Sequence, residues 1–152
     1  MSRLFFSVDV HGANSVWRKW LRIPDRHNID ALLFCGDLTG KSLVPIIKQN
    51  NDTYKAFYFG KNMTLKTKAE VDEMEKRIQD AGAYTMKANK EEIKHLQQNP
   101  QKVEQLIMKK IEKRLDNWMQ QLIDKVNVEK IDVIVMPGND DDFLADDVIK
   151  SY

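Results

Sequence analysis

Three short apolar runs constrain the fold more than any other feature of this sequence, because each one ends abruptly in polar residues. Leu4 to Val8 precedes Asp-Val-His-Gly, Ala31 to Cys35 precedes Gly-Asp, and Ile131 to Met136 precedes Pro-Gly-Asn-Asp. The middle run has the pattern of a strand covered on both faces in a parallel sheet, and the other two are equally β-prone. The sequence therefore predicts an α/β fold whose strands lead into polar loops.

The first two connections carry helical patterns. Residues 13 to 22 place apolar side chains at spacings of one, three and four, which predicts an amphipathic helix whose two Trp pack in the core. Pro24 is expected to stop this helix. A second helix is expected to start near Pro45 and to end at the polar residues 50 to 52.

The next part of the chain predicts a hairpin followed by a helical insertion. Residues 54 to 59 and 63 to 65 flank Gly60-Lys61-Asn62, which is typical of a hairpin. From about residue 66 to 127 the composition is helical, with many Lys, Glu, Gln, Met and Leu residues. An apolar stripe from Val103 to Val126 is expected to pack against the domain or the neighbouring insertion helix, and a dimer-forming helical pair is the alternative.

Length and charge indicate one domain without a global attraction for polyanions. The chain has 152 residues, and its 24 Lys and Arg nearly balance its 23 Asp and Glu, so residues 1–152 are expected to form a single domain. No apolar run approaches a membrane span, the N-terminal run is too short for a signal segment, and Cys35 has no partner for an internal disulfide. We therefore expect a cytoplasmic protein without a membrane partner, in which Cys35 is a buried thiol.

A basic patch on the predicted long helix raises the question of nucleic-acid binding. Lys109, Lys110, Lys113 and Arg114 lie close together in sequence, but acidic residues interrupt them. A solvated helix face is therefore favoured over a nucleic-acid partner.

Side chains that can bind metal ions follow all three predicted strands. Asp9 and His11 follow the first strand, Asp37 follows the second, and Asn139 and Asp140 follow the third. Each motif alone also fits ordinary turn or cap chemistry. Loops at the ends of parallel strands converge, however, so these side chains are expected to meet. Oxygen ligands mixed with an imidazole suit Mn, Fe or Zn, and a carboxylate can bridge two such ions.

In this order the motifs resemble the signature of the calcineurin-like metallophosphoesterases, which is Asp-x-His, then Gly-Asp-x-x-Gly, then Gly-Asn-His-Asp/Glu. The middle motif is complete as Gly36-Asp37-Leu38-Thr39-Gly40. The resemblance implies that Asp9 and His11 hold a first divalent ion. It also implies that Asp37 bridges to a second ion, which Asn139 holds. The expected function is hydrolysis of a phosphomonoester or phosphodiester substrate by a two-metal-activated hydroxide.

The sequence departs from that signature at two points. Asp140 replaces the His that contacts phosphate and assists the leaving group, so Asp140 is the catalytic candidate. A carboxyl group can act as an acid there only when it is protonated. Asp141 matches the position that orients this His. The family also completes both metal sites with three later His residues, whereas this chain has only His11, His27 and His95. We expect His27 on a surface loop and His95 on a polar helix, neither as a ligand.

The missing His residues imply that the chain covers only part of the family fold. The resemblance implies an αββα sandwich, of which this chain supplies mainly the first sheet, its flanking helices and the helical insertion. We expect the native chain to continue beyond Tyr152, since one apolar sheet face would otherwise lack its cover, and a second copy covering that face is the alternative. The competing function is a catalytically silent binding or assembly module that self-associates through this face or through the insertion.

Overall fold

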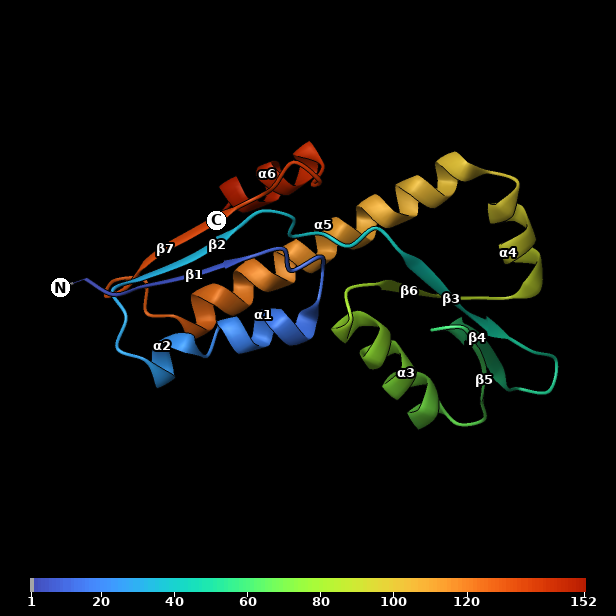
Figure 1. The fold of residues 1–152 in the computed structure, drawn as a ribbon. Coiled ribbons are helices and arrows are strands. Elements are labelled where there is room, and N and C mark those ends of the chain that lie inside the picture. Colours follow the sequence, from blue (N-terminus) through green and yellow to red (C-terminus); the bar gives the residue numbers. More distant parts are fainter. Residues whose placement is uncertain (1) are drawn as a thin grey trace.

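The chain folds around two separate β-sheets that lie along different parts of one long helix (Figure 1). The computed structural model describes residues 2–152. The first sheet is parallel with the order β1-β2-β7, formed by Leu4–Val8, Ala31–Cys35 and Asp132–Met136. The second sheet is mixed with the order β5-β4-β3-β6, formed by Lys61–Leu65, Tyr54–Tyr58, Leu43–Lys48 and Tyr84–Ala88. The predicted α/β class is confirmed.

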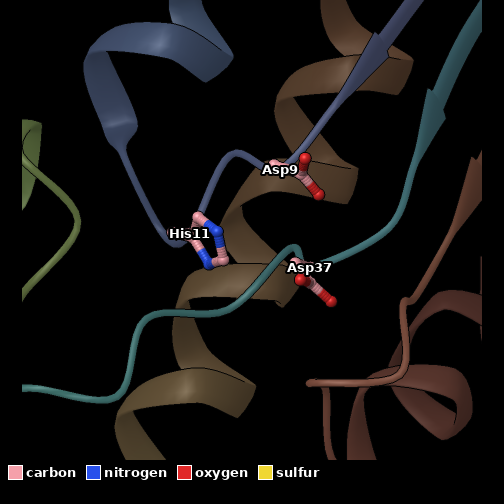
Figure 2. Close-up of side chains that lie close together, drawn as sticks. All are labelled: Asp9, His11 and Asp37. Carbon is pink, nitrogen blue, oxygen red and sulfur yellow. The ribbon is translucent and has the colours of Figure 1, made fainter.

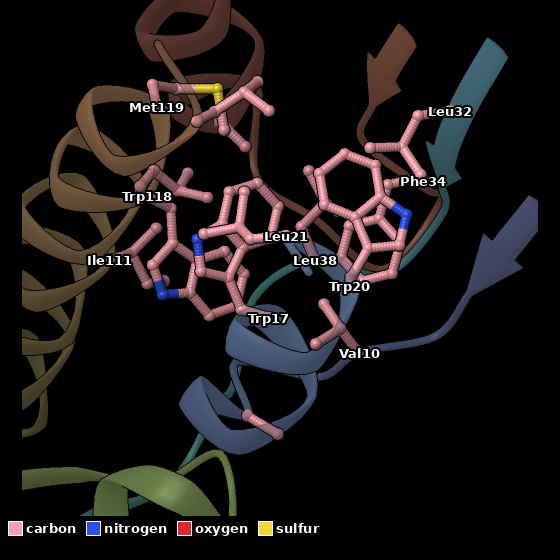
Figure 3. Packing of buried hydrophobic residues seen from close by; sticks show 14 of the residues in the cluster. Val10, Trp17, Trp20, Leu21, Leu32, Phe34, Leu38, Ile111, Trp118 and Met119 are labelled. Atoms are coloured by element: carbon pink, nitrogen blue, oxygen red, sulfur yellow. The ribbon is translucent and has the colours of Figure 1, made fainter. Parts of the chain in front are cut away.

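An aromatic cluster on one face of the first sheet forms the main core (Figure 3). Trp17 and Trp20 of α1 (Asn14–Trp20) pack with Phe34 of β2 and Trp118 of α5 (Pro100–Lys125). The ring centroids of Trp17 and Trp118 are 4.7 Å apart, and those of Trp20 and Phe34 are 4.9 Å apart. Burial of such large side chains dominates the hydrophobic stabilisation of a domain. The predicted core position of both α1 Trp residues is confirmed.

The apolar stripe of α5 is buried against this core. Ile111, Leu115, Leu122 and Val126 are all buried, and they belong to the same cluster as the Trp residues. The last helix, α6 (Phe143–Lys150), packs against α5 beside β7. Packing against the domain, which was the favoured prediction for this stripe, is therefore confirmed.

The other face of the first sheet is uncovered within residues 2–152. Leu4, Phe6 and Val8 of β1 are 59%, 56% and 46% exposed, whereas Phe5 packs against the core. Apart from Asp132 at the start of β7, the outward residues of β2 and β7 are also apolar, and they are Ala31, Leu33, Cys35, Ile134 and Met136. Since Leu33 and Cys35 are only partly buried, the predictions of a doubly covered second strand and of a buried thiol are wrong.

Two strands of the second sheet, β3 and β6, lie where the sequence predicted helical structure. Pro45 lies within β3 and not at a helix start. Its β-branched neighbours favour a strand. Proline has no N–H to donate, but β4 pairs with β3 only from Ile46 onward, so Pro45 is outside that pairing. The segment from 66 to 127 also contains β6, which pairs in parallel with β3. The prediction of a helical insertion is therefore wrong in part, because this segment also supplies one strand of the four-stranded second sheet.

The remaining elements follow the sequence more closely. Thr67 caps α3 (Lys68–Asp80), whose Ile78 packs on the second sheet, and α4 (Lys90–Gln97) precedes α5. The hairpin is confirmed with its turn at Phe59-Gly60. The first helix ends at Trp20, and Pro24 lies within the first turn of the short α2 (Ile23–Arg26), so Pro24 is not what stops it. None of the helices in residues 2–152 is both long and apolar enough to cross a bilayer.

Candidate metal centre

Asp9, His11 and Asp37 come together where β1 and β2 end (Figure 2). One ligand atom from each of the three side chains lies within 4.8 Å of the other two. The register explains this meeting, because Val8 pairs with Cys35 and the two strands leave the sheet side by side. Asp9 and His11 are exposed and Asp37 is partly buried. The predicted convergence is confirmed for these three of the five predicted residues, and metal binding by them stays a prediction.

All three residues have left-handed backbone conformations. Their φ angles are 56° at Asp9, 44° at His11 and 40° at Asp37, and they account for three of the five non-glycine residues with positive φ in residues 2–152. The loops hold each other in this conformation, since the His11 N–H donates to the Asp37 carbonyl at 2.8 Å and the Gly12 N–H to the Leu38 carbonyl at 2.7 Å. Strained backbone of this kind persists only where the surrounding structure holds it, and it is concentrated at functional sites.

Close backbone contacts place the His11 loop against the turn after α3. A Cβ atom on Gly82 would lie 2.2 Å from the His11 carbonyl oxygen, and one on Gly40 would lie 2.0 Å from the Gly82 carbonyl oxygen. Gly82 also has a φ of 103°. Both positions therefore require glycine, and their contact joins the two sheets behind the candidate site.

The side chain of Arg114 in α5 bridges the His11 loop and the turn after α3 by hydrogen bonds. Its guanidinium donates to the carbonyl oxygens of Gly12 at 2.7 Å, Gly82 at 3.0 Å and Ala83 at 2.9 Å. It also lies 4.0 Å from the centre of the Tyr84 ring, and burial lowers its pKa. The prediction that Arg114 belongs to a solvated basic face is therefore wrong, because its side chain points into the protein.

Asp141 ties the loop after β7 to the loop after β2. Its carboxylate accepts hydrogen bonds from the N–H groups of Leu38, Thr39 and Gly138 at 2.8 Å, and from the Thr39 hydroxyl at 2.6 Å. Burial raises the pKa of Asp141, but these hydrogen bonds outweigh it and hold the pKa below its usual value. Asp141 thus orients two loops, where the resemblance implied that it orients a His.

The backbone of Asp140 contacts Asp37. The Asp140 N–H donates to Asp37 Oδ1 at 3.1 Å, while the Asp140 carboxylate forms an ion pair with Lys41 at 2.5 Å. Asn139 is exposed on the same turn, and its role as a ligand stays a prediction. Sequence reasoning missed Lys41, although its position directly after the Gly36 to Gly40 motif was a usable signal.

A pocket of about 510 Å³ lies beside this ion pair. His11, Lys41 and Asp140 line it together with Phe57 and Phe59 of the β4-β5 hairpin. The pocket thus combines a candidate ligand, a cation and an apolar wall. The other two histidines are remote from it, since His27 caps α2 and His95 lies exposed on α4, as expected.

No family model, curated protein or solved structure matches this chain. The α/β class therefore comes from the structure itself, and any function has to be argued from the geometry of the site and from its motifs.

The donor set of Asp9, His11 and Asp37 could hold a metal ion. One imidazole nitrogen and two carboxylate oxygens suit a divalent transition ion. Ligand atoms about 2.1 Å from an ion lie at most about 4.2 Å apart, so donor atoms already within 4.8 Å need only small movements. No second group of three such residues occurs in the part of the chain that the structure describes.

Proposed function

We propose that this chain is a metal-dependent phosphoesterase module of the calcineurin-like metallophosphoesterase type, built on the first sheet of an αββα sandwich. The observation that carries this proposal is the meeting of Asp9, His11 and Asp37 at the ends of two paired parallel strands. The order of the three motifs and the left-handed backbone at the three ligand positions support it.

Asp9, His11 and Asp37 would hold one divalent ion. Bound there, the ion would supply Lewis-acid polarisation of a phosphoryl oxygen and would lower the pKa of a water molecule. Asp37 and Asn139 are the residues available to a second ion, which would need further donors, because residues 2–152 gather only one group of three. The protein's own contribution is to fix Asp37, whose Oδ1 accepts the Asp140 N–H.

The pocket beside His11 supports a phosphorylated substrate. Lys41 supplies a positive charge beside Asp140, which stands in place of the signature His, and an ammonium group binds phosphate oxygens as a point charge. While it is ionised, the Asp140 carboxylate can only accept hydrogen bonds, and its ion pair holds the Lys41 ammonium at the pocket. We therefore assign phosphate binding to Lys41 and positioning of Lys41 to Asp140.

Hydrolysis of 4-nitrophenyl phosphate and bis(4-nitrophenyl) phosphate, with and without Mn²⁺, tests the proposal. Asp37→Asn should lose Mn²⁺ binding in calorimetry and about 100-fold or more of the activity. Asp52→Asn is the matched control, because Asp52 also has a left-handed φ (57°) but lies in an exposed turn outside the ligand group. Unchanged metal binding and turnover in Asp37→Asn would show that the assigned site is wrong.

A catalytically silent module that self-associates is the second candidate, and the uncovered sheet face favours it. Apart from Asp132, the outward residues of the three strands are uncharged, so two copies of this face can meet without opposing like charges. Sedimentation velocity should then show a dimer that Phe6→Ser dissociates. A monomer with Mn²⁺-dependent turnover contradicts this second candidate.

A further inference from the structure

A second pocket, of about 420 Å³, lies between α1, α5, the end of α3 and β6. Four cations line it, and these are Arg18, Lys110, Lys113 and Arg114. None of its lining residues is an Asp or Glu, and it shares no lining residue with the pocket beside His11. It is therefore a separate pocket with an excess of positive charge.

Two of the four cations have no counter-ion among residues 2–152. Arg18 pairs with Asp80 at 2.6 Å, and Arg114 is engaged by backbone carbonyls. Lys110 and Lys113 take part in none of the ion pairs of the described chain. They are three positions apart on α5, a spacing at which like charges lie on one face and repel each other. An anion between them would remove that repulsion.

We propose that this pocket binds a small phosphate monoester. A phosphate monoester carries a charge of about −1.5 to −2 near neutral pH, which matches the two free lysines, whereas a carboxylate would neutralise only one. Its oxygens accept hydrogen bonds, and the cavity volume is in the range of small-molecule sites. A nucleic-acid strand fits less well, because Glu112 and Asp116 lie on the same helix around the next pocket, which Lys113 also borders.

Titration of metal-free protein in EDTA with inorganic phosphate tests the site without involving the metal centre. Two of the three Trp residues, Trp17 and Trp118, line the pocket, so intrinsic fluorescence reports its occupancy. The Lys110→Gln/Lys113→Gln variant should bind phosphate at least about tenfold more weakly. Lys109→Gln/Lys125→Gln is the matched control, with the same charge change on the same helix outside the pocket.

The expected result is saturable binding of phosphate with acetate much weaker, an unchanged affinity in the control variant, and an unchanged affinity in Asp37→Asn. Equal weakening in both lysine variants would overturn the proposal, because diffuse charge would then explain the binding. Binding that requires Mn²⁺, or that Asp37→Asn abolishes, would place the phosphate at the metal centre. Tighter binding of longer oligonucleotides through Lys110 and Lys113 would replace the small ligand by a nucleic-acid strand.

Discussion

The Asp141→Asn substitution tests whether one carboxylate holds the loops after β2 and β7 together. Asp141 Oδ2 accepts from the N–H groups of Leu38 and Gly138, and Oδ1 accepts from the N–H and hydroxyl of Thr39. An Asn side chain has one acceptor oxygen, so its amino group must face at least one backbone N–H. Because Leu38 and Thr39 are buried, water does not replace the lost acceptor. An unpaired buried donor costs about 1–3 kcal/mol, and weaker neutral hydrogen bonds add to it. We expect a loss of about 2–3 kcal/mol at pH 7.

Thermal and urea denaturation, followed by circular dichroism, measure this loss. For a domain of this size it corresponds to a decrease in Tm of roughly 4–12 °C. Asp147→Asn is the matched control, because Asp147 is an exposed residue of α6 whose side chain accepts no hydrogen bond among the described residues. We expect this control to stay within about 0.5 kcal/mol of the parent.

The pH dependence gives a second, independent readout of the same carboxylate. Burial raises the pKa of Asp141, but the hydrogen bonds from Thr39, Gly138 and Leu38 lower it overall, below the ordinary value of 3.8. A carboxyl group with a lowered folded-state pKa contributes its full stability above the unfolded-state pKa and loses it as the pH falls through the folded-state pKa. The difference between parent and Asp141→Asn should be constant from about pH 5 to 7 and shrink below about pH 4. A variant that matches Asp147→Asn at pH 7, or a difference that persists in acid, refutes the reasoning.

Three further comparisons test the junction and the core by urea denaturation. Arg114→Met removes three hydrogen bonds to carbonyl groups and should lower the free energy of unfolding by about 2–4 kcal/mol. The exposed Lys109→Met should lower it by about 0.5 kcal/mol. Similar losses in the two variants would mean that Arg114 is not needed at the junction. Gly82→Ala brings a Cβ to 2.2 Å from the His11 carbonyl and should cost more than about 2 kcal/mol. Gly60→Ala, at a positive φ in open space, should cost less, and the reverse order would contradict the contact. Phe34→Ala, at a fully buried position, should lower the free energy of unfolding by about 3–5 kcal/mol. Phe6→Ala, at 56% exposure, should lower it far less. Equal losses in the two variants would show that the outer sheet face is covered.

The first sheet could be predicted because its signals are local. The strands β1 and β2 have the expected bounds, since their apolar runs end at Gly or Asp residues that leave the sheet. The second sheet could not be predicted in full, because β6 has the composition Tyr-Thr-Met-Lys-Ala within a Lys- and Glu-rich segment. Its strand conformation comes from pairing with β3, about 40 residues earlier, and tertiary pairing overrides local propensity.

The site was predictable to the same extent as the sheet that carries it. Asp9, His11 and Asp37 meet because parallel strands deliver their following loops to one edge, which sequence order alone indicates. Arg114 and Asp141 could not be assigned their roles, because their partners include backbone groups 102 to 103 residues away in sequence, and the other partners of Arg114 are 31 to 32 residues away. An Arg in a Lys-rich helix, or an Asp within Asp140-Asp141-Asp142, carries no local sign of the groups that it will contact.

The backbone at the candidate ligands is one part of the argument for the proposed site. A non-glycine residue in the left-handed region costs of order 1–2 kcal/mol, so Asp9, His11 and Asp37 together cost about 3–6 kcal/mol. That is a large part of the 5–15 kcal/mol by which a typical domain is stable. Asp52 and Phe59 adopt the same conformation in turns outside the site, and Asp and His enter this region more readily than most residues, so left-handed backbone alone does not mark a ligand. Asp9, His11 and Asp37 differ from Asp52 and Phe59 because their side chains meet where β1 and β2 end, which is the arrangement that the proposed metal ion would need.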